Sequence, residues 1–278
     1  MTSDKILIRM KEDIILRGYS SSAQEHYIPA VRAFFKHFEG ENQDELKEDQ
    51  VRSYLLHMAN DLARKPQTIN THNAALRFLF DVTLDRPLRL KHVPRMKVPK
   101  HLPRILSREE LREVFHRCDT LRQKAFFLLG YGSGLRSSEI VNLKASDIEA
   151  KNMRILVREG KGKRDRYAML SQITLDTLRE YWRESRPNSP NNYLFPGTTA
   201  EQHASRRSLY CELVKVLGKG YSPHTLRHCF ATHMLEDGVN LLRIQNLLGH
   251  ACIRSTMVYL HLTNTTQDIV SPADKLLS

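Results

Sequence analysis

The chain has 278 residues, with 43 lysines and arginines against 31 aspartates and glutamates, and its formal net charge is +12 at pH 7. This length is long for one domain and suits two, each able to bury its own hydrophobic core. The positive charge favours a polyanionic partner, DNA or RNA before acidic lipid, although charge alone leaves open a basic surface that binds nothing.

Cysteine and hydrophobic patterns narrow the class of protein further. The four cysteines are scattered without a Cys-x-x-Cys pair, which argues against a disulfide framework and against a zinc site. No apolar run approaches the roughly 18 residues that cross a bilayer, and the first residues do not form a signal peptide. We therefore expect a cytoplasmic, nucleoid-associated protein with no membrane partner.

Four helices are predicted in residues 1–85, which we assign to an N-terminal domain. Apolar residues at helical spacing place these helices at about 4–16, 22–38, 51–62 and 67–79. The first helix should stop at Gly18, because glycine readily adopts the left-handed conformation that ends a helix. The aromatic residues of the second helix follow the helical period, which indicates a buried face rather than groups that stack on bases.

Residues 86–106 are predicted to be a basic, proline-rich linker. Eight lysines and arginines but no acid lie between Arg86 and Arg108, and four prolines disfavour a helix. The uniform charge favours a strap along DNA phosphates rather than a solvated tether, since each contact releases counterions. The expected DNA-binding residues of this stretch are Arg95, Lys97, Lys100 and Arg104.

A second domain is predicted at residues 107–266. Ser107 and Glu110 have the spacing of a capping box at a helix start. Two short strands are expected at residues 153–157 and 166–170, joined by a hairpin connection. Further helices are expected at about 172–185, 201–217, 223–236 and 240–248. The predicted fold class is mainly α, with a four-helix N-terminal domain and an α-rich second domain that carries a small antiparallel β-sheet.

Six residues of the second domain match the needs of a phosphodiester attacked by a phenol oxygen. Arginine holds two phosphate oxygens at once and keeps its charge, histidine can move protons near neutral pH, and lysine can protonate a leaving oxygen. Taken singly, each would be a surface charge, a turn residue or a half-buried aromatic. In chain order they are Arg136, Lys161, His224, Arg227, His250 and Tyr259.

Two of these residues gain support from their local setting. Arg136 precedes a helix predicted at residues 137–143, whose first backbone N–H groups would also favour an anion. Arg227 lies three residues after His224 on one predicted helix, so the two side chains should face the same way.

Three motifs carry a resemblance to the tyrosine recombinases of the Xer and phage-integrase type. They are YGSGLRSSEI at residues 131–140, PHTLRHCFAT at 223–232, and LLGH at 247–250 followed by Tyr259. Their occurrence together and in order is specific, whereas each motif alone is weak. The N-terminal helices resemble, more loosely, the SAM-like core-binding domain of that family. The 171–222 stretch lacks the inserted helix of the similar integron integrases, so recognition of folded single-stranded sites is not expected.

The resemblance implies a role for each residue of the set. Tyr259 would form a 3′-phosphotyrosine and free a 5′-hydroxyl, and Lys161 would protonate the leaving oxygen. Arg136 and Arg227 would clamp the phosphate, and His224 and His250 would complete its hydrogen bonding and proton handling. Lys163 is counted among the DNA contacts. Neither ATP nor any metal or other cofactor is expected, because the phosphotyrosine conserves the energy of the broken bond.

The same resemblance implies duplex DNA with inverted-repeat core sites as the partner and a homotetramer on two synapsed sites. The tail at residues 267–278 is interpreted as a short helix that docks into a neighbouring protomer, with a frayed end as the alternative. The biological task stays open between integration, excision, cassette movement in a mobile element and chromosome-dimer resolution. The alternatives to a recombinase are a type IB topoisomerase-like strand transferase and a catalytically silent DNA-binding accessory factor.

Overall fold

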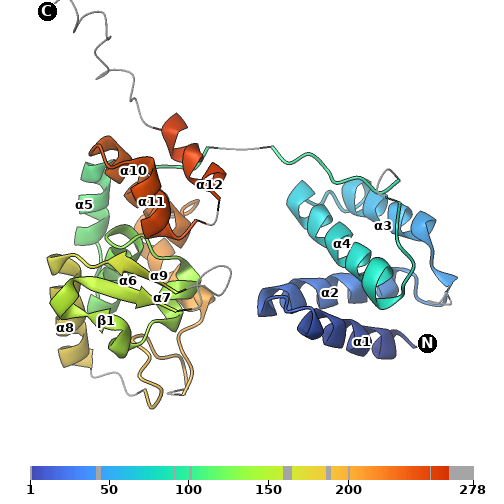
Figure 1. The fold of residues 1–278 in the computed structure, drawn as a ribbon, viewed down its shortest axis with the longest axis horizontal. Helices are drawn as coiled ribbons and strands as arrows, with labels where there is room; N and C mark the ends of the chain where they lie inside the picture. The colour runs from blue at the N-terminus through green and yellow to red at the C-terminus, as the bar shows by residue number, and fades with distance from the viewer. Residues whose placement is uncertain are drawn as a thin grey trace, which may run out of the picture. The chain divides into compact units, whose positions relative to one another are not determined.

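The computed structural model of the chain describes residues 2–41, 45–89, 92–99, 102–158, 165–185, 189–199, 201–250 and 252–262. It divides into two compact units, Met1–Lys100 and His101–Ser278 (Figure 1). Lys100, Lys161, Lys163 and the tail from residue 263 onward lie outside the described residues.

The first unit is the predicted four-helix bundle. Its elements are α1 (Ser3–Leu16), α2 (Ser21–His37), α3 (Glu48–Asn60), α4 (Pro66–Phe78) and the π-helical turn η2 (Leu79–Thr83). Apolar residues from all of them form one core, in which Met10, Phe34 and Phe80 are almost fully buried. Gly18 has a φ of +67°, which confirms the glycine stop expected after α1.

The stretch that follows η2 is bound to the first unit at residues 86–89 and 92–97. Leu88 and Val93 are buried in the bundle core. Arg77 on α4 donates to the carbonyl of Val93, and Asn70 exchanges two hydrogen bonds with the backbone of Met96, at 3.0 and 2.9 Å. The described residues of this stretch form no helix, in line with its prolines. Two apolar side chains among the basic ones therefore anchor much of the expected linker.

The second unit is built from helices around a small sheet. Its elements are α5 (Arg108–His116), α6 (Leu121–Tyr131), α7 (Ser137–Asn142), β1 (Ile148–Glu149), β2 (Arg154–Val157), β3 (Arg166–Met169), α8 (Gln172–Ser185), α9 (Arg206–Leu217), α10 (Pro223–Glu236), α11 (Leu241–Leu248), α12 (Arg254–Met257) and the 3-10 turns η3 (Ala145–Asp147), η4 (Ala150–Asn152) and η5 (Val258–His261). Ser107 and Glu110 form the predicted capping box of α5.

The sheet of the described residues is antiparallel, in the order β1-β2-β3, with Ile155 of β2 opposite Ala168 of β3. The prediction of β2 and β3 is confirmed, whereas β1 was missed because two residues show no alternation. The helix predicted from residue 201 begins only at Arg206. Its expected first turn is instead taken by a loop that ends at Ser205, whose hydroxyl accepts from the backbone N–H of Ser208.

Helix α6 lies at the centre of this unit, and the helices that carry the candidate site residues are arranged around it. It is buried along most of its length and packs against α8, α9 and α10. The chain leaves α6 directly into the start of α7, while α10, α11 and α12 lie beside one another at the C-terminal end (Figure 1). Among the described helices, none combines the length and the hydrophobicity that a membrane crossing requires.

Candidate active site

Arg136 is fixed at the start of α7 by a tight turn and by Glu139. Gly134 adopts a φ of +62°, and a Cβ there would lie 2.6 Å from the ring of Phe230, so the turn tolerates no larger residue. The backbone N–H of Arg136 donates to Glu139 at 2.8 Å, and its Nη1 donates to the same carboxylate at 2.7 Å. The anion expected at this helix start is therefore supplied by the protein itself.

Glu139 also binds Arg166, an arginine outside the set predicted from the sequence. Arg166 on β3 donates to both carboxylate oxygens, at 2.8 and 2.9 Å, and its Nε donates to the carbonyl of Leu247 at 3.2 Å. Burial alone would raise the pKa of Glu139, but the hydrogen bonds and charge of Arg166, followed by those of Arg136, lower it to about 2. The carboxylate is thus ionised at any physiological pH.

Arg227 on α10 joins the turn before α7 to the end of α11. Its Nη1 donates to the carbonyl of Gly134 at 2.5 Å, and its Nη2 donates to that of Leu248 at 2.6 Å. Glu139 lies 3.8 Å away. Burial, and then repulsion by Arg136, lower the pKa of Arg227 to about 10, so the guanidinium still keeps its charge at neutral pH.

The two predicted histidines lie at the ends of helices. His224 is on the first turn of α10, with an exposed side chain, and partial desolvation followed by the charge of Arg227 lowers its pKa. His250 follows Gly249, which ends α11 with a φ of +63°. The Nδ1 of His250 lies 2.9 Å from the hydroxyl of Thr256, and burial followed by Arg227 lowers the pKa of His250 to about 4.

Tyr259 lies on η5 with only 2% of its surface exposed. Its ring is nearly parallel to that of His250, with centroids 6.4 Å apart. Its hydroxyl lies 3.1 Å from Nδ1 of His228. Burial raises the pKa of Tyr259, and the guanidiniums of Arg227 and Arg136 partly offset this effect. The phenol is therefore protonated at neutral pH and stabilised in its ionised form by two cations.

The structure brings five of the six predicted residues to one place in the second unit. Arg136 reaches the α11 end by donating to the carbonyl of Gly249 at 3.2 Å, and Arg227, His250 and Tyr259 meet there. His224 shares the helix of Arg227. Lys161 lies outside the described residues, as does Lys163. In the described chain, no group of three or more His, Cys, Asp or Glu side chains is arranged to hold a metal ion.

The predicted DNA contacts lie apart from this cluster in the chain. Arg95 and Lys97 are exposed on the stretch bound to the first unit. Arg104, in the second unit, is exposed and lies over the ring of Tyr221 at 5.1 Å. Lys100 lies outside the described residues.

Three residues of the site were missed in the sequence: Glu139, Arg166 and His228. Two of them carried a local signal. Glu139 follows Arg136 by three residues, and His228 follows His224 by four, so each pair lies on one helical face. Arg166 carried none, because its contact with Glu139 spans 27 residues of chain.

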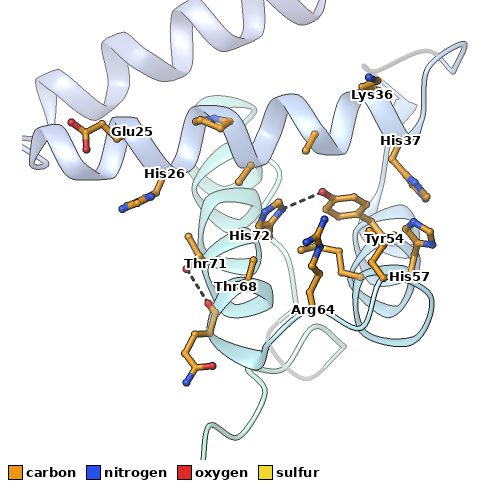
Figure 2. A pocket seen from close by; sticks show the side chains of 16 residues that line it. Glu25, His26, Lys36, His37, Tyr54, His57, Arg64, Thr68, Thr71 and His72 are labelled. Atoms are coloured by element: carbon orange, nitrogen blue, oxygen red, sulfur yellow. Dashed lines mark hydrogen bonds between the residues drawn. The ribbon is translucent and has the colours of Figure 1, made fainter. Parts of the chain in front are cut away.

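The first unit contains a cavity that no motif predicted. It has a volume of about 750 Å³ and opens between α2, α3 and α4 (Figure 2). The hydroxyl of Tyr54 lies 3.1 Å from Nδ1 of His72, and the rings of His37 and His57 stack with centroids 4.5 Å apart. The polar residues that line it include His26, Lys36, His37, His57, Arg64, Thr68 and His72.

Comparison with known protein families and structures gives consistent matches. Residues 104–266 match the phage integrase family, and residues 6–90 match the phage integrase N-terminal SAM-like domain. The chain is 38% identical over 275 residues to a protein of Sinorhizobium fredii named as the integrase/recombinase y4qK, covering 96% of this chain and 88% of that protein. It is 32% identical over 268 residues to the tyrosine recombinase XerD of Lacticaseibacillus casei, covering 89% and 90%.

Solved structures agree in fold. A crystal structure of XerA recombinase matches with a TM-score of 0.53 and 26% identity, covering 96% of each chain. The XerH site-specific recombinase bound to its palindromic difH substrate matches with a TM-score of 0.71 and 22% identity, covering 91% of this chain and 80% of that one. The chain therefore belongs to the phage integrase family, the tyrosine site-specific recombinases.

Proposed function

We propose that Tyr259 is the nucleophile of this recombinase and that Arg136 and Arg227 bind the phosphate it attacks. The observation that carries the proposal is the position of a buried tyrosine whose ionised form two guanidiniums stabilise. Three arginines share the single carboxylate of Glu139, so this cluster keeps a net charge of +2. That excess suits a phosphoryl group whose negative charge grows as the fifth oxygen approaches.

In the proposed reaction, each step exchanges one phosphorus–oxygen bond for another. The oxygen of Tyr259 attacks the phosphorus, the bond from phosphorus to the 5′ oxygen breaks, and the 3′ end stays attached to the enzyme as a phosphotyrosine. Lys161 gives a proton to the leaving 5′ oxygen, a role proposed from its motif. A second 5′-hydroxyl then attacks the phosphotyrosine and releases Tyr259, so the number of phosphodiester bonds is conserved.

Duplex DNA is the partner, and the first unit offers a surface for it. Lys36 and Arg64 are exposed at the rim of its cavity, and Arg95 and Lys97 are exposed on the adjoining stretch. Cations arranged in this way bind phosphates with little sequence preference. The histidine and threonine side chains that line the cavity between α2, α3 and α4 are the groups we propose to contact base edges. We assign Arg104, Lys100 and Lys163 to further phosphate contacts.

Assembly follows from the chemistry, because each Tyr259 attacks one phosphate and stays attached until rejoining. Two complete strand exchanges therefore need four protomers on two inverted-repeat sites. We assign residues 267–278, which lie outside the described residues, to a segment that docks into the next protomer. Such a head-to-tail contact forms a closed ring when the rotations between successive protomers add up to a full turn.

Trapping on a nicked duplex tests the nucleophile. A binding site is first selected from random duplexes with the Tyr259→Phe protein, and a nick is placed so that the freed strand diffuses away. The wild-type protein should accumulate as a covalent complex, whereas Tyr259→Phe should bind with the same affinity and form none. Tyr131→Phe is the matched control, since its hydroxyl is also paired with a histidine of α10 at 3.0 Å. Covalent trapping of the Tyr259→Phe protein would remove Tyr259 from this role.

A further inference from the structure

His228 is the polar side chain that holds the oxygen of Tyr259. Its Nδ1 lies 3.1 Å from the phenol oxygen, and the two ring centroids are 5.7 Å apart. The contact joins α10 to η5 across 31 residues of chain. His228 lies four residues after His224, so these two side chains share one face of α10. This residue was not part of the set selected by motif.

The attack by Tyr259 requires a group that accepts its proton. A phenol is a weak nucleophile until the proton leaves, and the acceptor must lie within hydrogen-bond reach. Arg136 and Arg227 carry only donors, so they stabilise a phenolate but cannot take a proton. The Nδ1 of His250 is already paired with the hydroxyl of Thr256, and the His250 ring lies nearly parallel to the phenol with centroids 6.4 Å apart.

Among the histidines of the described site, His228 is the one whose ring nitrogen has a hydrogen-bond contact with the Tyr259 oxygen. Burial, followed by the charges of His224 and Arg227, lowers the pKa of His228 to about 4, so its imidazole is neutral at pH 7. With its proton on Nε2, the neutral ring accepts the hydroxyl of Tyr259 at Nδ1. A phosphate that binds beside it adds negative charge, which favours the protonated imidazole at the moment when the proton arrives.

We propose that His228 is the catalytic base of this recombinase, and that its Nδ1 takes the proton of Tyr259 as the phenol oxygen bonds to phosphorus. The inference rests on the proposed role of Tyr259. In the forward step the O–H bond of Tyr259 breaks, its oxygen bonds to phosphorus, and the 5′ oxygen leaves with a proton from Lys161. In the rejoining step Lys161 takes back the proton of the attacking 5′-hydroxyl, and the protonated His228 returns its proton to the departing Tyr259 oxygen. His224 and His250 are left to bind the phosphate.

The test measures single-turnover formation of the covalent complex on the selected nicked duplex between pH 7 and 9. His228→Asn places an amide near the position of Nδ1, which preserves a hydrogen bond but cannot take up a proton. We expect cleavage at pH 7 to fall about 100-fold or more. The matched control is His233→Asn on the same helix, which disturbs the buried pair of His233 with Tyr131 and should cleave at the wild-type rate.

The pH dependence separates a base from a structural role. Without a base, the variant reacts only through Tyr259 molecules that are already ionised, and their fraction grows about tenfold for each pH unit below the phenol pKa. The ratio of variant to wild-type rate should therefore rise with pH. Taking the ratio cancels the titration of groups that both proteins share, including His224 on α10, His250 after α11 and Lys161. A ratio that stays constant with pH, or a His228→Asn rate within about threefold of wild type, overturns the proposal.

A second measurement does not depend on how the His228 variant folds. Fluorotyrosine in place of Tyr259 in the otherwise unchanged chain has a more acidic phenol. If His228 is the base, the pH at which the cleavage rate levels off should be the same for the fluorotyrosine protein as for the wild-type protein. A profile that moves to lower pH together with the phenol pKa overturns the proposal. Absence of any covalent complex with the wild-type protein would instead overturn the proposed role of Tyr259, and the base with it.

Discussion

Glu139→Gln removes one negative charge from the centre of the site while nearly preserving the shape of the side chain. The carboxylate of Glu139 accepts hydrogen bonds from Arg136 and from both ends of the Arg166 fork, and Arg227 lies 3.8 Å away. A neutral amide leaves these guanidiniums repelling one another, and its NH2 group would face a donor. The variant should therefore unfold more easily.

The size of the effect follows from the pKa and the burial of the carboxyl. The pKa of Glu139 falls from 4.5 to about 2, and its side chain is only 7% exposed, so solvent screens the interaction little. At about 1.4 kcal/mol per unit, this shift amounts to about 3 kcal/mol in favour of the ionised form. That agrees with the roughly 3–5 kcal/mol lost when one member of a buried ion pair is removed. For a unit of this size the transition should fall by about 6–12 °C.

Calorimetry of the whole chain gives the transition temperature of the second unit, provided that the two units are resolved as separate transitions. Glu149→Gln is the matched control, because its carboxylate pairs with Arg154 at 2.6 Å but is 28% exposed. The control should shift the transition only slightly. An equal shift for the two variants would refute the argument that burial makes the Glu139 cluster the stronger one.

The pH dependence has a definite sign. The folded-state pKa of Glu139 lies below its unfolded value, so its contribution is complete above about pH 4.5 and is lost as the pH falls toward about 2. The difference in unfolding free energy between wild type and Glu139→Gln should shrink across that window.

Three further predictions address residues outside the described part of the chain or on its surface. Lys161→Ala should slow cleavage far more with a 5′-oxygen leaving group than with a 5′-thio one, which leaves without a proton, and equal defects would exclude Lys161 as the acid. Replacing Arg95, Lys97 and Lys100 with alanine should weaken binding to all sequences alike and flatten the slope of log K against log salt by up to about 0.9 per lost contact; an unchanged slope would leave this stretch a tether. Deleting residues 267–278 should leave one-site binding intact on native gels but impair synapsis and recombination, and wild-type recombination by the truncated protein would make the tail a frayed end.

Much of the fold could be predicted because it rests on local signals. The apolar spacing that buries Phe34 in α2 also defines that helix, and the capping box at Ser107 marks the start of α5. Where the local signal was weak, the prediction was wrong or incomplete. Strand β1 is two residues long and pairs with β2, and the loop before α9 contains an isolated bridge between Pro196 and His203.

The residues of the candidate site likewise fall into those with a local sequence signal and those defined by tertiary contacts. The arginines, histidines and tyrosine could be selected because their side-chain chemistry and their motifs agree, without knowledge of how they meet. The spacing of His228 from His224 was a local signal, but the contact of Arg166 with Glu139 and that of His228 with Tyr259 span 27 and 31 residues of chain, so no local pattern predicts these contacts. The burial of Tyr259 is also a tertiary property, because it arises where η5 packs against α10.

Arg227 shows why charge and architecture cannot be separated at this site. Its two donors bind the carbonyl of Gly134, in the turn that carries Arg136, and the carbonyl of Leu248, at the end of α11 just before His250. One guanidinium therefore sets the distance between this turn and the end of α11, and in the proposed mechanism it also supplies part of the charge that binds the phosphate. Lysine would keep the charge but has no rigid fork to reach both carbonyls. The placement of the groups proposed to bind the phosphate is thus built into the same bonds that hold α7, α10 and α11 together.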